Sequence, residues 1–383
     1  MHVVDATLFF SPTSGGVKRY LLAKHEWMRA HTNWRHSLVV PGEARSHVPG
    51  DISTVAGQRV PGTFNYRLPL NPLRWSRAIE ALEPDLIEVG DAFHPAWAAS
   101  RVAQRRGIPL IAFYHSNFPQ LAGRRLGAGV QKLIEWYVRE TYERCELVLA
   151  PSKHTCDYLH GIGVSHATTQ PLGVDVDTFH PSRRGRDLVA ELGLPRGTRL
   201  LAFAGRFSAE KNIPVLTDAF RKLGDPYHLL LIGGDQANRH DNVTRIPYCR
   251  DNHQLASYLA SVDAFVHAGV HETFGLVVLE AMACGRPVVA MRAGALPELV
   301  DDGVGILAEP HDDPEIAAAS IAGAVSALYD SDLAELGAAA RRHVESHYSW
   351  TRALQALMSR YQAAVGARRR VGVETALPSA TLQ

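Results

Sequence analysis

The chain has 383 residues, and because a single hydrophobic core usually stops growing near ~250–300 residues, this length favours two domains. Hydrophobic residues make up 46% and charged residues 21% of the chain, a globular composition that excludes a disordered chain or a coiled coil. The 40 Lys and Arg residues against 39 Asp and Glu give a net charge of +1, which excludes a general attraction to nucleic acid.

The cysteines and the apolar runs exclude further classes of protein. Four cysteines, none of them in a CxxC pair, indicate neither a zinc site nor a disulfide framework. The first ten residues lack the basic start and long apolar stretch of a signal peptide, and the longest run of low charge, residues 317–329, is shorter than the ~20 residues of a membrane span. We therefore expect a cytoplasmic protein.

Short apolar runs alternate with amphipathic segments along the chain, which predicts the α/β class with parallel sheets. We expect strands at residues 2–10, 37–40, 86–89, 110–113, 147–150, 200–204, 228–232, 264–267, 287–291 and 305–308. About five strands in each half predict two doubly wound Rossmann-like domains that face each other across a cleft. Such sheets bind ligands at the carboxyl ends of their strands.

A stretch rich in proline, glycine and charge, residues 170–199, separates the two halves. We therefore predict one domain over residues 1–172 and a second over residues 173–350. Apolar residues spaced three and four apart predict a helix over residues 351–367, which either packs on the second domain or crosses back to the first. Residues 368–383 lack periodicity, which predicts a flexible tail.

The turn after the first strand contains two adjacent glycines, Gly15 and Gly16, and leads into a helix. Glycines let the backbone approach a ligand closely, and a helix start offers free N–H groups to an anion, so this turn suits a phosphate. It has neither the GxGxxG spacing nor the P-loop ending. A tight structural turn explains the same residues equally well.

Two further segments follow predicted strands of the second half. In the first, Arg206 and Lys211 stand five apart, where both cations could converge on a diphosphate or could line a solvated loop. In the second, Glu272 and Glu280 flank an apolar run, and a carboxylate there needs a partner or a ligand. We place Glu272 in a loop and Glu280 in the following helix, where they would accept hydrogen bonds from sugar hydroxyls or form structural pairs.

In the first half, His115 and Asp91 each follow a predicted strand, and taken alone both fit a structural role as well as a functional one. Residues 101–144 hold eight Lys or Arg and three Glu, a local excess of +5, with interleaved apolar residues. This stretch fits a surface for lipid headgroups or an ordinary solvated basic face.

The ordered set GGVKRY, AGRFSAEKN and HETFGLVVLEAMACGRPVVA, followed by GALPELVDDGVGIL, resembles the retaining glycosyltransferases of family 4, which have the GT-B fold. The likeness runs from Val3 to about Tyr361. It implies that the C-terminal domain binds most of a nucleotide-diphosphate sugar, a UDP- or GDP-sugar, and that the N-terminal domain binds the acceptor. The implied donor-binding residues are Gly15, Gly16, Arg206, Lys211, Glu272, Thr273, Phe274, Gly275, Leu276 and Glu280.

The resemblance also assigns catalytic roles to His115, Arg206, Lys211 and Glu272. We expect Asp91 and Asn117, which follow predicted strands of the first half, to bind the acceptor. It implies a retaining α-glycosyltransferase that uses no metal or other cofactor besides its nucleotide-sugar co-substrate. The acceptor would be a glycan, a lipid or a small molecule, with peripheral contact to the inner face of the membrane through residues 101–144. A nucleotide-sugar epimerase and a non-catalytic sugar-binding module remain alternatives.

Overall fold

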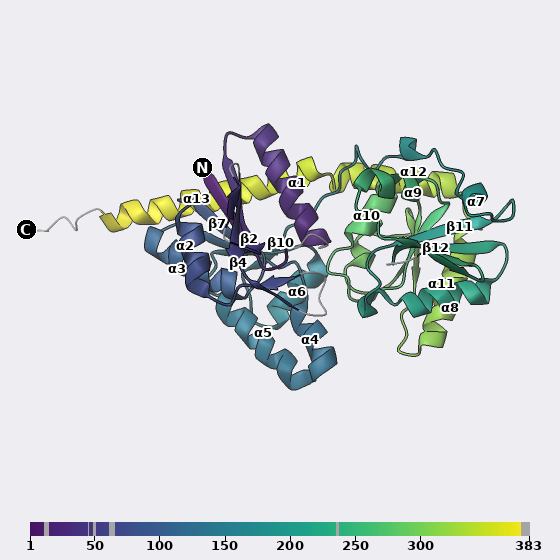
Figure 1. The fold of residues 1–383 in the computed structure, drawn as a ribbon, viewed down its shortest axis with the longest axis horizontal. Coiled ribbons are helices and arrows are strands. Elements are labelled where there is room, and N and C mark those ends of the chain that lie inside the picture. The colour runs from purple at the N-terminus through teal and green to yellow at the C-terminus, as the bar shows by residue number, and fades with distance from the viewer. Residues whose placement is uncertain (11–14, 45, 49–50, 61–65, 235–236, 377–383) are drawn as a thin grey trace, which may run out of the picture. The chain divides into compact units, whose positions relative to one another are not determined.

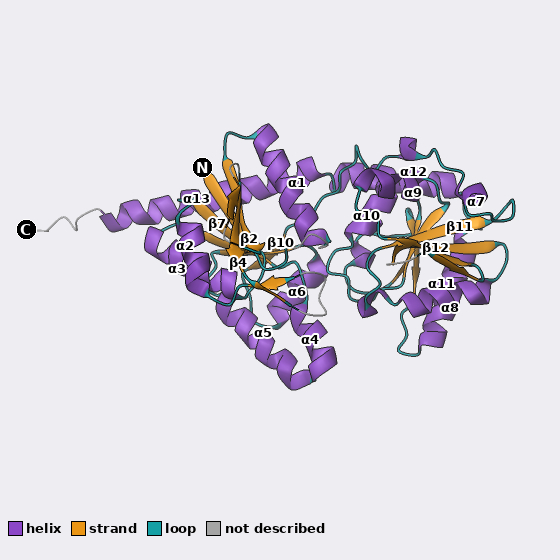
Figure 2. Cartoon of the chain, viewed as in Figure 1, coloured by secondary structure: helices purple, strands orange, loops and turns teal. Residues whose placement is uncertain are grey.

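The computed structural model describes residues 1–10, 15–44, 46–48, 51–60, 66–234 and 237–376. The chain forms two compact units. Unit 1 contains residues 1–171 and 353–383, and unit 2 contains residues 172–352 (Figure 1). Each unit is built on a mostly parallel sheet with helices on both faces (Figure 2), so the predicted α/β class with two parallel-sheet domains is confirmed.

The sheet of unit 1 has the strand order β10-β9-β8-β7-β1-β2-β4-β3, and only β3 runs antiparallel to its neighbour. Its strands are β1 His2–Ala6, β2 Arg35–Gly42, β3 Ser46–Val48, β4 Ile52–Ala56, β7 Leu86–Val89, β8 Leu110–Phe113, β9 Leu147–Ala150 and β10 Ala167–Thr169, and β5 Gln58–Arg59 pairs separately with β6 Arg67–Leu68. Its helices are α1 Gly16–His31, α2 Pro72–Glu80, α3 His94–Arg106, α4 Phe118–Leu126, α5 Ala128–Tyr142, α6 Lys153–Gly161 and, from residue 353 on, the C-terminal α13 Trp350–Ala376.

Two expectations for the first strand and the last helix need correction. The strand predicted over residues 2–10 ends at Ala6, because the backbone N–H of Leu8 donates to the Asp91 carboxylate at 2.7 Å instead of continuing the ladder. Helix α13 continues to Ala376, past the predicted end at residue 367, and an ion pair of 3.0 Å between Arg368 and Glu146 holds this extension. Residues 377–383 lie outside the described residues.

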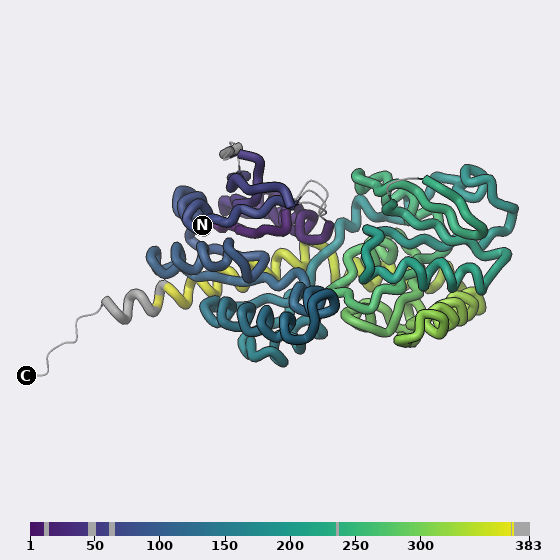
Figure 3. Tube along the Cα trace, turned by 60° about the horizontal axis from the view of Figure 1, so that its bottom comes forward, coloured from purple at the N-terminus to yellow at the C-terminus, as the bar shows by residue number. Residues whose placement is uncertain are grey.

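Helix α13 packs on unit 1 through a buried polar cluster. Lys24 of α1 is fully buried, and its Nζ lies 2.6 Å from Asp5 of β1 and 2.8 Å from Glu88 of β7. The hydroxyl of Tyr361, on α13, accepts from Lys24 at 3.0 Å and donates to Glu88. The hydroxyl of Tyr20 also donates to Glu88, at 2.8 Å. We call these five residues the Lys24 cluster; Figure 3 shows the yellow helix passing along unit 1.

Unit 2 has the strand order β13-β14-β12-β11-β15-β16-β17, and only β13 is antiparallel. Its strands are β11 Arg199–Ala204, β12 Tyr227–Gly234, β13 Asn238–His240, β14 Val243–Pro247, β15 Ala264–His267, β16 Val288–Met291 and β17 Gly305–Ala308. Its helices are η1 Pro181–Arg183, α7 Leu188–Glu191, η2 Ala209–Lys211, α8 Ile213–Leu223, α9 Asn252–Ala260, α10 Leu276–Ala283, η3 Leu296–Glu298, α11 Pro314–Leu328 and α12 Leu333–His347.

The layers of unit 2 place helices α9, α10 and α12 over one face of its sheet and α8 and α11 over the other (Figure 2). Strands β11 and β15 are direct neighbours, yet β12 follows β11 in the chain on the opposite side. The strand order therefore reverses between β11 and β15. In an open parallel sheet such a reversal separates the loops at the carboxyl ends and is where ligands bind.

Candidate functional site

Two loops flank the reversal in unit 2, and each carries a charged residue that the sequence singled out. The loop after β11 contains Lys211, the last residue of η2, and the loop after β15 contains Glu272. The Nζ of Lys211 donates directly to Glu272 Oε1. The side chain of Asn212 links the same loops, because its Nδ2 donates to the carbonyl of Ala268 at 3.1 Å. The structure therefore brings these two predicted residues together.

His267, at the end of β15, is the third member of this group. Its Nδ1 accepts from the Gly269 N–H at 3.1 Å, which leaves the proton on Nε2. That Nε2 lies 3.1 Å from Glu272 Oε1. One carboxylate oxygen of Glu272 thus faces a lysine and a neutral imidazole. We call His267, Lys211 and Glu272 the donor cluster, after the role that the resemblance implies for Lys211 and Glu272.

The charges of the donor cluster follow from burial and proximity. Burial by itself would raise the pKa of Glu272, but the Lys211 charge and the His267 hydrogen bond outweigh it and lower that pKa well below its usual range. Burial lowers the pKa of His267, which therefore stays neutral. The side chains of Lys211 and Glu272 keep 19% and 14% of their surface exposed, so a ligand can reach a fixed positive and a fixed negative charge.

Helix α10 begins next to the donor cluster. Its N-cap, Gly275, has φ 101°, a left-handed conformation that side chains rarely adopt, and Leu276 is its first residue. Thr273 and the buried Phe274 precede it. The helix start has no side-chain cap, and free N–H groups at such an end suit an anion. Glu280 lies within α10, as predicted, and is 3% exposed.

Two other residues shape this edge of the sheet. Arg206 is half-buried and follows Gly205 directly after β11, on the same loop as Lys211. Gly294 has φ 59°, and a Cβ there would lie 2.7 Å from the Glu272 carbonyl. The Ala295 N–H donates to that carbonyl at 2.9 Å. The backbone of the GALPELV segment therefore holds the backbone of Glu272 in place.

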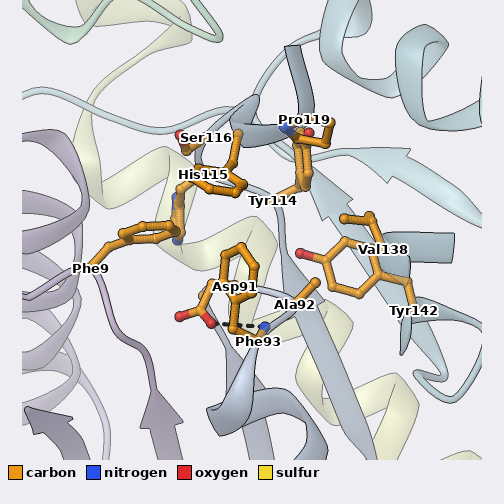
Figure 4. Close-up of a pocket in the computed structure, with 12 residues that line it drawn as sticks. Phe9, Asp91, Ala92, Phe93, Tyr114, His115, Ser116, Pro119, Val138 and Tyr142 are labelled. Carbon is orange, nitrogen blue, oxygen red and sulfur yellow. Dashed lines mark hydrogen bonds between the residues drawn. The ribbon is translucent and has the colours of Figure 1, made fainter. Parts of the chain in front are cut away.

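In unit 1, a small pocket lies at the carboxyl ends of β7 and β8, lined by Phe9, Asp91, Tyr114 and His115 among others (Figure 4). Its cavity volume is about 20 Å³, enough for a water molecule and far less than a sugar site. The imidazole of His115 stacks on Phe113 with a centroid distance of 4.3 Å. Burial, with a contribution from the Lys24 charge, lowers the pKa of His115 to about 3, so it is neutral near pH 7.

Asp91 joins the two loops at the strand reversal of unit 1, between β1 and β7. Its carboxylate accepts from the Thr7 hydroxyl at 2.9 Å, from the Leu8 N–H at 2.7 Å and from the Phe93 N–H at 3.1 Å. Burial raises its pKa to about 6 despite these hydrogen bonds. These three hydrogen bonds give Asp91 a structural role, because they hold the two loops together.

The remaining predicted residues of unit 1 lie at helix starts. Asn117 is the N-cap of α4, and its Oδ1 accepts from the Tyr114 hydroxyl at 3.2 Å. Gly15 is the N-cap of α1, with no side-chain cap, and Gly16 is its first residue. A Cβ on Gly15 would meet no atom within 4 Å.

Sequence reasoning missed His267 and Gly294. His267 ends a predicted strand, and the next loop carries Glu272, so its position in the sequence was a usable signal. The sequence alone does not show that its Nε2 lies next to the Glu272 carboxylate. Among the described residues, no group of three or more His, Cys, Asp or Glu side chains is arranged to hold a metal. Across the same part of the chain, no helix combines the length and apolar character of a membrane span.

Comparisons with known proteins bear on the fold and the family of this chain. A family model described as Glycosyltransferase Family 4 matches residues 14–178, and one described as Glycosyl transferases group 1 matches residues 198–326. The GDP-mannose-dependent alpha-(1-6)-phosphatidylinositol dimannoside mannosyltransferase of Mycobacterium tuberculosis is 29% identical, over 94% of this chain and 95% of its own. A GDP-mannose-dependent alpha-mannosyltransferase of Corynebacterium glutamicum is 27% identical, over 99% and 93%.

Solved structures show the same fold. Sucrose-phosphate synthase from Thermosynechococcus elongatus matches with a TM-score of 0.78 at 21% identity, over 96% of this chain and 99% of the other. HepE of Anabaena, solved with UDP and glucose, matches with a TM-score of 0.74 at 18% identity, over 94% and 99%. The predicted GT-B fold is confirmed. The chain belongs to the family 4 glycosyltransferases, which use nucleotide sugars.

Proposed function

We propose that this glycosyltransferase moves mannose from GDP-mannose to a hydroxyl of a membrane-associated glycolipid, with retention of the α configuration and without a metal. The observation that carries the proposal is the donor cluster, a fixed lysine and carboxylate beside an uncapped helix start at the strand reversal of unit 2. Relatives of nearly the same length whose names specify GDP-mannose, one of them with a phosphatidylinositol dimannoside acceptor, support the choice of donor and acceptor.

The donor cluster suits a reaction in which negative charge develops on a leaving diphosphate. Cleavage of the anomeric C–O bond leaves the electron pair on the GDP oxygen, and Lys211, Arg206 and the α10 N–H groups would stabilise it. The acceptor hydroxyl attacks from the face that GDP leaves, and its proton passes to a diphosphate oxygen. Glu272 and Glu280 would accept hydrogen bonds from the hydroxyls of the mannose and the ribose.

His115 fits a hydrogen-bonding role in this proposal. Because its pKa is about 3, it is neutral at pH 7 and does not serve as a general acid. A neutral imidazole both donates and accepts a hydrogen bond. We assign it to orienting the donor sugar at the reacting centre, with Gly15 and Gly16 contributing backbone N–H groups. Asp91 and Asn117, which lie in the loops after β7 and β8, are assigned to the acceptor.

A hairpin of unit 1 supports the membrane part of the proposal. Helices α4 and α5 pack against each other as a hairpin (Figure 1). Leu126 and Leu133 are 68% and 63% exposed, and Trp136 is 52% exposed. Arg124 and Arg125 are exposed beside them. Exposed apolar and cationic side chains on such a hairpin suit an anionic lipid interface.

Product analysis tests the proposed reaction. The protein is incubated with GDP-mannose or UDP-glucose, with and without phosphatidylinositol dimannoside in detergent. We expect GDP release only with GDP-mannose and acceptor together, and an α-mannosidic product by NMR. A new nucleotide sugar formed without acceptor would identify an epimerase, and transfer of glucose alone or a β-linked product would contradict the proposal.

Vesicle sedimentation tests the membrane contact separately. The double variant Leu126→Ser/Leu133→Ser should lose binding to vesicles that contain phosphatidylglycerol. The control is Ile316→Ser in unit 2, which removes an apolar side chain that is 49% exposed. Equal binding by both variants would contradict the assignment of this surface.

A further inference from the structure

Unit 2 has a large pocket at the end of its sheet opposite to the donor cluster. Its lining includes Asp263, which precedes β15, and Gly285 and Arg286, which precede β16. These strands are parallel, so the pocket is at their amino ends, whereas the donor cluster is at the carboxyl ends. The cavity volume is about 540 Å³, within the range of ligand sites. The proposed transfer reaction makes no use of this pocket.

The pocket gathers four arginines from three segments of the chain. Arg184 follows η1, Arg286 follows α10, and Arg341 and Arg342 lie on α12. The only carboxylate among the residues named as its lining is Asp263. Asp263 already accepts from the Leu200 N–H at 2.8 Å and from the Tyr329 hydroxyl at 3.2 Å. Arg341 forms an ion pair of 2.6 Å with Glu345. The excess of positive charge in the lining therefore comes from the other three arginines.

Two of the arginines are held in fixed positions. Arg286 donates to the carbonyls of Val262 at 2.9 Å and Cys284 at 3.3 Å, which uses two of the five N–H donors of a guanidinium. Arg341 donates to the carbonyls of Val176, Phe179 and Ala283. Arg341 is therefore a structural residue. Arg286 is held in position by its two hydrogen bonds and keeps three N–H donors for a ligand.

The other two arginines have no such task. Arg184 and Arg342 are exposed, and within the described ranges neither side chain has a hydrogen bond or an ion pair. Burial lowers the pKa of Arg286, and the neighbouring Arg184 charge lowers it further. Like charges are thus held close together, a cost that a bound anion would relieve. A second pocket of about 410 Å³ shares Arg184 and Asp263 with this one.

We propose that Arg184, Arg286 and Arg342 form a binding site for a small phosphate-bearing molecule, separate from the nucleotide-sugar site. Guanidinium groups match the geometry of phosphate with two parallel hydrogen bonds each. The Leu333 side chain and the adjoining pocket provide room for the rest of a molecule the size of a sugar phosphate. A soluble phosphate ester and a lipid phosphate headgroup share this chemistry, and the experiment distinguishes them.

Calorimetry on the full chain tests the site with glucose 6-phosphate as the probe and glucose as its uncharged match. We expect binding of the phosphate only, and about a tenfold or larger loss of affinity in Arg184→Ala/Arg342→Ala, since charge-assisted hydrogen bonds are lost. Arg196→Ala, an exposed arginine elsewhere in unit 2, is the matched control and should bind normally. Lys211→Ala should also bind normally, because the donor cluster is a different site.

A parallel arm uses vesicles of phosphatidylglycerol or phosphatidylcholine. Sedimentation with phosphatidylglycerol that depends on Arg184 and Arg342, together with no response to glucose 6-phosphate, would assign the phosphate to a lipid headgroup. An equal loss in Arg196→Ala would overturn the proposal in favour of general charge attraction. Loss of binding in Lys211→Ala alone would place the phosphate at the donor site, and absence of any response to either probe would also overturn the proposal.

Discussion

The Lys24 cluster of unit 1 and the donor cluster of unit 2 both place a lysine against acidic and polar side chains. The two clusters differ in how far solvent reaches that lysine. In unit 1, Lys24 is fully buried and two tyrosine hydroxyls complete its surroundings. In unit 2, Lys211 and Glu272 remain partly exposed at the carboxyl edge of the sheet. A closed cluster fixes the fold, whereas an open one retains charge that a ligand can use.

The charge states show the same contrast. Lys24 faces two buried carboxylates, and its single positive charge does not offset the effect of burial on the pKa of both. Burial raises the pKa of Glu88, whereas Lys24 and His36 outweigh burial at Asp5 and lower its pKa. Lys211 faces only Glu272, whose pKa is strongly lowered. The two clusters therefore respond differently to loss of their lysine.

The largest expected effect is that of Lys24→Met on stability. The variant leaves two buried carboxylates without a cation, which costs about 3–5 kcal/mol of unfolding free energy. Urea unfolding followed by circular dichroism measures the change. Lys153→Met is the control, because this lysine is 75% exposed in its pair with Asp157 and such pairs contribute at most about 1 kcal/mol. Similar midpoints for both variants would contradict a structural role for the Lys24 cluster.

Lys211→Met should instead affect catalysis. Loss of a charge that stabilises the leaving diphosphate should lower kcat about 10²–10³-fold, while the melting temperature changes less than in Lys24→Met. GDP release under saturating GDP-mannose measures the first quantity. The control is Lys222→Met, which removes an exposed ion pair with Glu315 in the same unit. Turnover close to wild type would exclude Lys211 from the donor site.

Asp91 is a buried carboxylate whose pKa is set mainly by burial, so its effect on stability should depend on pH. Its folded pKa of about 6 exceeds the ~3.9 of an unfolded chain, so the folded state binds the proton more tightly. This contribution to stability is complete below about pH 4 and is lost as the pH rises through about 6. The unfolding free energy of wild type minus that of Asp91→Asn should therefore fall by about 3 kcal/mol between about pH 4 and pH 7. A pH-independent difference would contradict the raised pKa.

Tyr361→Phe tests the link between α13 and the Lys24 cluster. The variant removes a hydrogen bond to buried Glu88 and one from Lys24, which should cost about 2 kcal/mol, because hydrogen bonds to charged groups are the stronger ones. Thermal unfolding measures this loss. Tyr137→Phe, on the exposed surface of α5, should change nothing. An unchanged melting temperature in Tyr361→Phe would contradict a stabilising role for this hydroxyl.

The smallest effect is expected for His267→Leu. His267 positions Glu272 through its Nε2–H, and its loss should reduce kcat/KM for GDP-mannose about tenfold, roughly one charge-assisted hydrogen bond. His267→Gln keeps a donor on a side chain of similar reach and should recover part of the activity. Equal activity of both variants would contradict a positioning role through this hydrogen bond.

The sequence predicted the strands of the buried sheet core well and the edges poorly. The strands at residues 86–89 and 264–267 have the bounds that their apolar runs predicted, because strands covered on both faces are continuously apolar. β4 Ile52–Ala56 and β10 Ala167–Thr169 were missed. The first is only half-buried and the second has three residues, so neither stands out from its surroundings.

The sequence by itself determined the α/β class, the two halves and the loops on which Lys211 and Glu272 lie, because apolar periodicity and short motifs are local properties. Tertiary structure decided which side chains meet: Lys24 with Asp5 and Glu88, His267 with Glu272, and the arginines of three separate segments around one pocket. It also decided that residues 353–376 of α13 belong to unit 1. The apolar spacing of that helix specifies a buried face. The unit on which it packs is specified by contacts with distant residues, such as the Tyr361 hydroxyl with Lys24 and Glu88 and the ion pair of Arg368 with Glu146.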